Sequence, residues 1–332
     1  MDKPRVAILD DYQNLALQLA DWDAVRERCD VVVFDEHLPE DEAARALRDF
    51  DAICLTRERM ALPGTLLERL PRLKFIAVTG PHNRTLDFDA AGRLGITVSC
   101  TRRSAAGQFA TAELAWGLIL ALARNIPGEA ENMRQGGWQR TVGMSLATRT
   151  LGLVGLGRLG SHMAPVAHAF GMKVIAWSQN LTEETARALN VARVEKEELF
   201  RRSDFVSLHL VLSERTRHIV GARELGCMKT TAFLVNTARG ALVDREALVE
   251  ALRRRRIAGA ALDTFDVEPL PRHDPLRAMD NVILTPHLGY TVRELLAPFY
   301  AATVENVMAW LDGKPLRVLT AEQPRLSGQV VE

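Results

Sequence analysis

Residues 151–160 read Leu-Gly-Leu-Val-Gly-Leu-Gly-Arg-Leu-Gly, and this stretch decides the fold of the 332-residue chain. Gly155, Gly157 and Gly160 fit the spacing G-x-G-x-x-G, after an apolar run typical of a strand and before a helical pattern. The first glycine permits a tight turn, the second lets a pyrophosphate approach the backbone, and the third lets helix and strand pack closely. A second strand pattern follows, so the stretch predicts a dinucleotide site that includes Arg158 and Leu159.

The end of that second strand bears on the choice of cofactor. A carboxylate usually stands there to bind the ribose hydroxyls, but the chain reads Trp177-Ser178-Gln179-Asn180. Ser178 leaves no charge to repel a 2′-phosphate, yet no Lys or Arg stands within those positions to bind one. The nearest cations are Arg158 and Arg187, so NAD and NADP both remain open.

Similar strand patterns recur along the whole chain and alternate with helical patterns. The earlier series is Val6–Leu9, Val31–Phe34, Ala52–Leu55, Phe75–Val78 and Ile96–Ser99. The later series is Leu151–Val154, Val174–Trp177, Phe205–Leu208, Ala232–Val235, Ala260–Leu262 and Val282–Leu284. This alternation predicts an α/β protein with two doubly wound parallel sheets.

Composition narrows the possible partners and the compartment. The 42 Lys and Arg residues balance 42 Asp and Glu residues, so we expect neither nucleic acid nor a membrane surface as a partner. The longest apolar run, Leu114–Ala123, is half a bilayer span and predicts a buried core helix. The N-terminus lacks a signal-peptide pattern, and the four cysteines are widely spaced without a C-x-x-C pair. We therefore expect a reducing, cytoplasmic compartment and no metal site.

Three ionisable residues follow the last three strand patterns: Arg239, Glu268 and His287. The carboxyl ends of parallel strands face the ligand crevice of an open sheet, so we expect these side chains to converge beside a nicotinamide. Arg grips a carboxylate with two hydrogen bonds, His passes a proton near neutral pH, and a neighbouring Glu favours the charged imidazolium. Each residue alone has a structural alternative, but together they predict a carbonyl reduction.

These segments resemble the D-isomer-specific 2-hydroxyacid dehydrogenase family over nearly the whole chain. The most specific matches are residues 155–160, 234–240, 262–269 and 285–287. The resemblance implies that Arg239 orients a 2-oxo acid, that His287 is the acid/base, and that Glu268 pairs with His287.

The resemblance also implies the remaining ligand contacts. Asp263 is expected at the nicotinamide amide, and the other cofactor contacts are Ser178, Leu210, Thr237, Ala238 and Gly289. The substrate carboxylate is expected at backbone amides of the loop Gly80-Pro81-His82-Asn83-Arg84, where Gly80, His82 and Asn83 join Arg239 as substrate-binding residues. Pro81 has no N–H and Ser178 is not acidic, and these are two departures from the family pattern.

The family resemblance further implies an inserted domain. Residues 1–103 and 290–332 would form a flavodoxin-like substrate domain, and residues 104–289 an NAD(P)-binding Rossmann domain. Family members are commonly homodimers joined through the nucleotide domain. The irregular stretch Asn125–Thr150, which contains Trp138, is expected to be the arm that joins them; a mobile surface loop is the alternative.

The predicted function is that of an NAD(P)-dependent oxidoreductase acting on a CH–OH group. It would interconvert a small 2-oxo acid and its D-2-hydroxy acid, like a glyoxylate or hydroxypyruvate reductase. Two alternatives stay open: a phosphoglycerate dehydrogenase-like enzyme lacking a regulatory domain, and a dinucleotide-sensing binding protein on the same fold. The residues do not identify the hydroxy acid.

Overall fold

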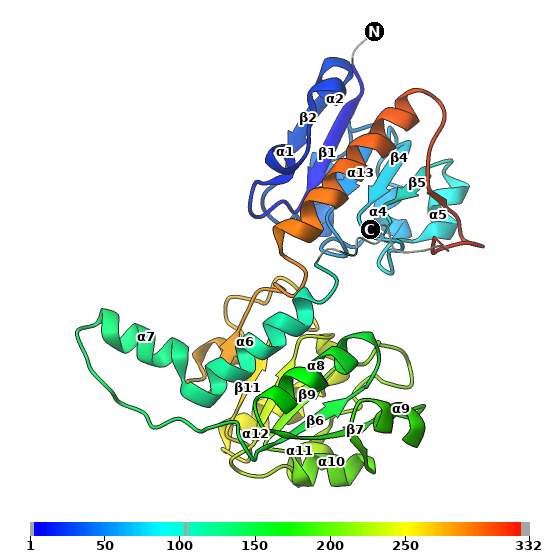
Figure 1. Cartoon of the computed structure of the whole chain (residues 1–332). Helices are drawn as coiled ribbons and strands as arrows, with labels where there is room; N and C mark the ends of the chain where they lie inside the picture. Colours follow the sequence, from blue (N-terminus) through cyan, green and yellow to red (C-terminus); the bar gives the residue numbers. More distant parts are fainter. Residues whose placement is uncertain (1–2, 103–104, 106, 327–332) are drawn as a thin grey trace. The chain divides into compact units, whose positions relative to one another are not determined.

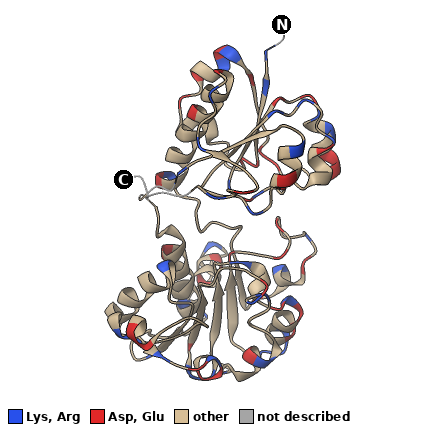
Figure 2. Cartoon of the chain, turned by 90° about the vertical axis from the view of Figure 1, so that its right-hand side faces the viewer, with Lys and Arg blue, Asp and Glu red and all other residues tan. Residues whose placement is uncertain are grey.

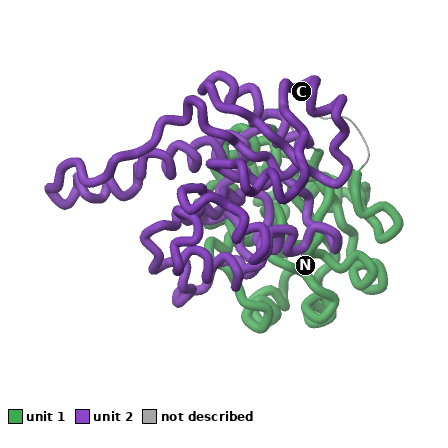
Figure 3. The backbone as a smooth tube through the Cα atoms, turned by 90° about the horizontal axis from the view of Figure 1, so that it is seen from below, with its two compact units in different colours: residues 1–108, 292–332 green, residues 109–291 purple. Residues whose placement is uncertain are grey.

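The computed structural model describes residues 3–102, 105 and 107–326. The chain forms two compact units, which are called unit 1 (residues 1–108 and 292–332) and unit 2 (residues 109–291) (Figures 1 and 3). The sequence predicts one domain boundary between residues 103 and 104, which lie outside the described residues. It predicts the other between residues 289 and 290, and the two units divide between residues 291 and 292. Unit 2 begins at Phe109, immediately before helix α6, and the Phe109 ring stacks on His162 within this unit, with 3.9 Å between the ring centroids.

Unit 1 is built on a six-stranded sheet in the order β13-β5-β4-β3-β1-β2. Only β13 is antiparallel, so the parallel strands run in the flavodoxin-like order 2-1-3-4-5. Its strands are β1 (Arg5–Leu9), β2 (Asp30–Val33), β3 (Ala52–Leu55), β4 (Phe75–Val78), β5 (Thr97–Cys100) and β13 (Val318–Leu319). Its helices are α1 (Ala16–Leu19), α2 (Asp23–Arg28), α3 (Glu40–Ala46), α4 (Gly64–Leu67), α5 (Phe88–Arg93) and α13 (Arg293–Leu311).

Burial explains why these short apolar runs become strands. β3 and β4 are buried along their whole length, as expected for parallel strands covered on both faces. Helices α3, α4 and α5 contribute to the core on one face of the sheet. On the other face α13 packs against β4, with Trp310 stacked on Phe75 at 5.1 Å.

Unit 2 is built on a seven-stranded, wholly parallel sheet in the order β12-β11-β10-β9-β6-β7-β8. This is the Rossmann order, extended by β12 at one edge. Its strands are β6 (Thr150–Val154), β7 (Lys173–Trp177), β8 (Ala192–Arg193), β9 (Phe205–Leu208), β10 (Phe233–Asn236), β11 (Gly259–Leu262) and β12 (Val282–Leu284). The two-residue strands β8 and β13 are too short to show as patterns in the sequence.

The helices of unit 2 divide between the two faces of its sheet. They are α6 (Ala110–Arg124), α7 (Ile126–Arg134), α8 (Arg158–Ala169), α9 (Glu183–Ala188), α10 (Lys196–Arg202), α11 (Ala222–Cys227) and α12 (Arg245–Arg253), with 3₁₀ turns η1 (Gly240–Leu242) and η2 (Pro275–Ala278). One hydrophobic core involves α6, α8 and α9, and the other involves α10, α11 and α12. Thus α6 confirms the buried helix predicted from the apolar run at 114–123.

The prediction that residues 125–150 are irregular throughout is wrong. Residues 126–134 form α7. Pro127 lies in the first turn of this helix, where a backbone N–H has no hydrogen-bond partner within the helix, so a proline is compatible with the helix start. The helix and the extended segment after it project from the rest of unit 2 (Figure 1).

Charges of both signs are interspersed over the helices and loops of each unit (Figure 2). Within the described part of the chain, no helix has both the length and the apolar character needed to cross a bilayer.

Candidate active site

The glycine turn after β6 has the geometry of a phosphate cradle. Gly155 has a φ of +102°, and a Cβ there would stand 2.8 Å from the carbonyl oxygen of His209. A Cβ at Gly160 would overlap the carbonyl oxygen of Gly155, so this glycine permits the close approach of α8 to the turn. At Gly157 no described atom lies within 4 Å of the Cβ position, which leaves room above the backbone where α8 begins.

The other predicted cofactor residues lie at neighbouring strand ends. Leu210 follows β9, and its Cδ2 lies 3.0 Å from the Cβ position of Gly155. Ser178 follows β7 and is half-buried. Thr237 follows β10, and its buried Oγ1 has no hydrogen-bond partner among the described residues. The open glycine turn at the start of α8 fits the pyrophosphate of a dinucleotide.

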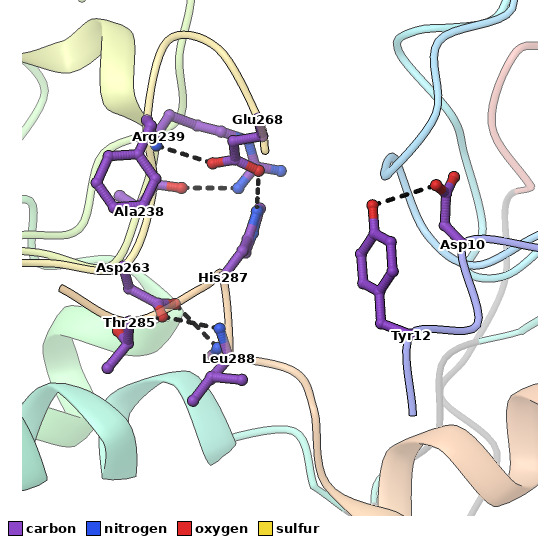
Figure 4. Close-up of polar contacts among 11 residues, drawn as sticks. Asp10, Tyr12, Ala238, Arg239, Asp263, Glu268, Thr285, His287 and Leu288 are labelled. Atoms are coloured by element: carbon purple, nitrogen blue, oxygen red, sulfur yellow. Dashed lines mark hydrogen bonds and ion pairs between the residues drawn. The ribbon is translucent and has the colours of Figure 1, made fainter. Parts of the chain in front are cut away.

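His287 and Glu268 form a direct pair in unit 2. The imidazole Nδ1 lies 2.6 Å from Glu268 Oε2 (Figure 4). Glu268 Oε1 also accepts a hydrogen bond from the Phe265 N–H at 2.8 Å. The His287 side chain is 28% exposed and that of Glu268 is 31% exposed. With Nδ1 engaged by the carboxylate, Nε2 is the ring nitrogen that can exchange a proton with a ligand.

The backbone at His287 is itself unusual. Its φ is +53°, in the left-handed region that non-glycine residues seldom adopt. Asp263, the buried residue after β11, accepts hydrogen bonds from Thr285 Oγ1 at 2.6 Å, Leu288 N–H at 2.8 Å and Gly289 N–H at 2.9 Å. These bonds hold the segment on both sides of His287 and compensate for the strain.

Burial is the main influence on Asp263, and it raises the pKa of this carboxyl above its ordinary value. The three donors act in the opposite direction, because they stabilise the carboxylate. The hydrogen bonds of Asp263 thus orient the His287 segment, a role that sequence reasoning missed together with that of Thr285. Its expected contact with a nicotinamide amide stays a prediction.

Arg239 lies on the loop between β10 and η1. Its Nη1 donates to the Ala238 carbonyl at 2.7 Å, and its own carbonyl accepts from Asn236 Nδ2 at 2.8 Å. Asn236 Oδ1 also accepts from the Ala238 N–H at 3.0 Å, so this amide side chain fixes the loop. Sequence reasoning missed this role, although an Asn at a strand end is a common turn-former.

The loops that carry Arg239 and Glu268 are in contact. A Cβ on Gly240 would overlap the backbone of Phe265 and Asp266, so only glycine allows the two loops to pack this closely. Arg239, Glu268 and His287 therefore follow the neighbouring strands β10, β11 and β12 at one edge of one sheet.

The predicted substrate loop lies in unit 1, after β4. The Gly80 N–H donates to Thr101 Oγ1 at 2.7 Å, so this amide is engaged within the protein. Asn83 is buried, and its Oδ1 accepts from the Thr85 N–H at 2.8 Å. Burial lowers the pKa of His82 to about 4, so this imidazole is neutral at pH 7. The substrate roles of these three residues stay predictions.

Unit 1 also holds a polar cluster that the sequence did not indicate. Asp10, buried directly after β1, has a φ of +54°. Its Oδ1 accepts from the Tyr12 hydroxyl at 3.1 Å and lies 3.2 Å from His37 Nδ1 (Figure 4). Burial raises the pKa of Asp10 above its ordinary value.

Comparison with known proteins identifies the family. Residues 116–289 match the family described as D-isomer specific 2-hydroxyacid dehydrogenase, NAD binding domain. Glyoxylate reductase of Aeropyrum pernix is 38% identical over 326 residues, which is 95% of each chain. Hydroxypyruvate reductase of Thermotoga maritima is 36% identical over 89% of this chain and 94% of that protein. The crystal structure of phosphoglycerate oxidoreductase from Vibrio cholerae matches with a TM-score of 0.87 and 36% identity, over 94% of this chain and all of that one. The chain therefore belongs to the D-isomer-specific 2-hydroxyacid dehydrogenase family.

Proposed function

We propose that this protein is an NAD(P)H-dependent reductase that converts a small 2-oxo acid into its D-2-hydroxy acid. The 2.6 Å contact between His287 and Glu268, at the same sheet edge as Arg239, carries the proposal. This pair is suited to stabilising an imidazolium that donates a proton to a carbonyl oxygen. The names of the similar glyoxylate and hydroxypyruvate reductases support small, polar substrates.

The protein's own residues have three tasks in this reaction. A bound reduced nicotinamide supplies the hydride. Arg239 binds the substrate carboxylate through its guanidinium, which orients the carbonyl group. His287 holds a proton on Nε2 and transfers it to the carbonyl oxygen, while Glu268 stabilises the charged ring from the Nδ1 side. The Gly155–Gly160 turn and Leu210 hold the dinucleotide.

The cofactor preference, the oligomeric state and the compartment are further parts of the proposal. Ser178 supports neither NAD nor NADP over the other, so both belong in the assay. A homodimer is supported by exposed apolar side chains on α7 and the segment after it, since large exposed apolar patches commonly mark interfaces. These residues are Ile126, Met133, Trp138 (71% exposed) and Val142. A reducing, cytoplasmic compartment is supported by the four unpaired cysteines, of which Cys29, Cys54 and Cys100 are buried.

A phosphoglycerate dehydrogenase-like activity is a second candidate. The similarity to phosphoglycerate oxidoreductase of Vibrio cholerae favours it. Including 3-phosphohydroxypyruvate in the substrate panel separates the two candidates.

The test is oxidation of NADH and NADPH, side by side, with glyoxylate, hydroxypyruvate, pyruvate, phenylpyruvate and 3-phosphohydroxypyruvate. We expect turnover with glyoxylate or hydroxypyruvate, and a loss of about 10²–10⁴-fold in kcat for His287→Ala. Arg239→Ala should raise KM and lower kcat together, whereas Arg45→Ala, an exposed residue of α3 in unit 1, should change neither. Tight cofactor binding without turnover on the whole panel would instead support a dinucleotide-sensing protein.

A further inference from the structure

After β13 the chain returns to the predicted substrate loop, which follows β4. The Leu326 N–H donates to the Pro81 carbonyl of this loop at 2.9 Å, and Arg325 forms an antiparallel bridge with His82. Loop and partner both belong to unit 1. The tail segment (residues 324–326) therefore contacts the loop that is expected to bind the substrate carboxylate.

The chain is anchored at several points before it reaches the loop. The Arg317 carbonyl accepts from the Cys100 N–H at 3.0 Å, and β13 then pairs with β5 (Figure 1). The Arg317 side chain donates to Asn306 Oδ1 on α13 at 2.9 Å. A turn follows, closed by the Gln323 N–H on the Thr320 carbonyl at 3.1 Å. The tail segment thus leaves a fixed part of unit 1.

Two hydrogen bonds from outside the loop hold its first two residues. Thr101 Oγ1, directly after β5, accepts from the Gly80 N–H at 2.7 Å, and the Leu326 N–H binds the next carbonyl, that of Pro81. The Leu326 side chain is half-buried and packs against the hydrophobic core of unit 1. Leu326 therefore ties the loop to that core.

The pairing does not use the N–H of His82. Because Leu326 bonds to Pro81, the bridged residues His82 and Arg325 form a non-hydrogen-bonded antiparallel pair. Residues in such a pair face each other without exchanging N–H···O bonds, so their N–H groups point away from the partner strand. The tail segment can hold the loop and still leave this amide for the substrate carboxylate.

From this geometry we propose that Leu326 is a positioning residue for substrate binding, which holds Pro81 and His82 in the conformation that binds the carboxylate of the 2-oxo acid. Without Leu326 the loop occupies that conformation for less of the time, and the apparent affinity for substrate falls in proportion. Bound substrate restores the conformation, so kcat is preserved. The effect on substrate rests on the proposed function, whereas the holding of the loop does not.

The first test is the kinetics of Leu326→Pro, with the 2-oxo acid that the wild type reduces fastest. Proline removes the N–H, and it is compatible with an extended residue before it, as Arg325 is in its bridge. Loss of this hydrogen bond should raise KM about two- to tenfold. It should leave unchanged both kcat and the Kd of NADH, whose predicted site lies in unit 2.

Three more variants serve as controls. Ala321→Pro places proline at the second position of the turn 320–323, where proline is favoured, and should keep the wild-type KM. Leu326→Met keeps the N–H and an apolar side chain, and should also keep it. Leu326→Ala keeps only the N–H and should give a smaller rise than Leu326→Pro. A wild-type KM in both Leu326→Pro and Leu326→Ala would overturn the proposal.

The second test needs no substrate, because His82 reports on the loop. Burial lowers the pKa of His82 to about 4. Nearby charges add smaller effects: Glu58 raises this pKa, whereas Arg84, Arg57 and Arg325 lower it. A loop that leaves the tail segment loses part of this burial and the charge of Arg325. The pKa of His82 should therefore rise towards its ordinary value.

The measurement is an NMR titration of the imidazole signals in the full-length protein, with His82→Gln to assign them. Leu326→Pro should raise the pKa of His82, while Leu326→Met and Ala321→Pro should keep it near the wild-type value. An unchanged pKa in Leu326→Pro would overturn the proposal, even if KM rises. A raised pKa in a protein whose wild type reduces no 2-oxo acid would instead refute the proposed function and leave the holding of the loop in place.

Discussion

Replacing Glu268 with Gln tests the proposed acid most directly. The substitution keeps the shape of the side chain and removes its negative charge, 2.6 Å from His287 Nδ1. Reduction requires the protonated imidazole, which is the acid that gives the carbonyl oxygen its proton. Without the carboxylate the imidazolium loses a favourable charge contact, so the rate of reduction should fall.

The magnitude follows from the distance and the exposure. Two unit charges about 4 Å apart attract by about 1 kcal/mol in water and about 4 kcal/mol at the effective dielectric constant of a protein surface. Both side chains are almost one-third exposed, so solvent screening places this pair between those limits. An attraction of about 1–3 kcal/mol corresponds to a factor of about 5–150 in rate. The kcat/KM of Glu268→Gln for glyoxylate should therefore be lower than that of the wild type by about 5–150-fold.

The assay is the initial rate of cofactor oxidation at one fixed pH and ionic strength, over a range of glyoxylate concentrations. Glu246→Gln, an equal loss of charge on the exposed first turn of α12, serves as the control and should leave kcat/KM unchanged. A wild-type kcat/KM in Glu268→Gln would refute the electrostatic role and leave Glu268 a structural residue.

Four further substitutions test other parts of unit 2. Asp263→Ala leaves the Leu288 and Gly289 N–H groups without their acceptor. The free energy of unfolding, measured in urea, should therefore fall by about 2–5 kcal/mol. Wild-type stability would contradict the inference that Asp263 holds the His287 segment in place. Gly160→Ala should destabilise unit 2, because the new methyl group overlaps the Gly155 carbonyl, while Gly157→Ala should fold normally and weaken NADH binding at least tenfold. The reverse pattern in thermal melts and fluorescence titrations would refute the assigned glycine roles. Burial lowers the pKa of His209 to about 4. Below pH 6.5 this imidazole therefore binds a proton in the unfolded chain, whereas in the folded protein it stays neutral until the pH approaches 4. Stability should therefore fall by about 3 kcal/mol as the pH drops from 6.5 to 4, and His209→Gln should show a shallower loss in urea titrations at each pH.

The sequence was informative wherever a feature depends on near neighbours along the chain. The spacing of Gly155, Gly157 and Gly160, between a strand pattern and a helical pattern, predicted a turn whose geometry the structure reproduces. Alternating strand and helix patterns predicted the two parallel sheets, because a buried parallel strand must be a short apolar run. The position of His287 and Glu268 after successive strands predicted their proximity, because parallel strands share one carboxyl edge.

Only the tertiary structure decided features that join distant segments. Asp263 bonds to Leu288, 25 residues away, and nothing in the local pattern distinguishes that role from contact with a nicotinamide. The start of α7 within an apparently irregular arm, and the fixing of the Arg239 loop by Asn236, likewise emerged only from the folded backbone. A pocket of about 300 Å³ in unit 2, lined in part by Phe265, is the clearest case, because its shape depends on how α12, η2 and two strand ends pack together. Sequence periodicity records which residues are buried, but the volume left between buried side chains depends on the packing of the whole unit.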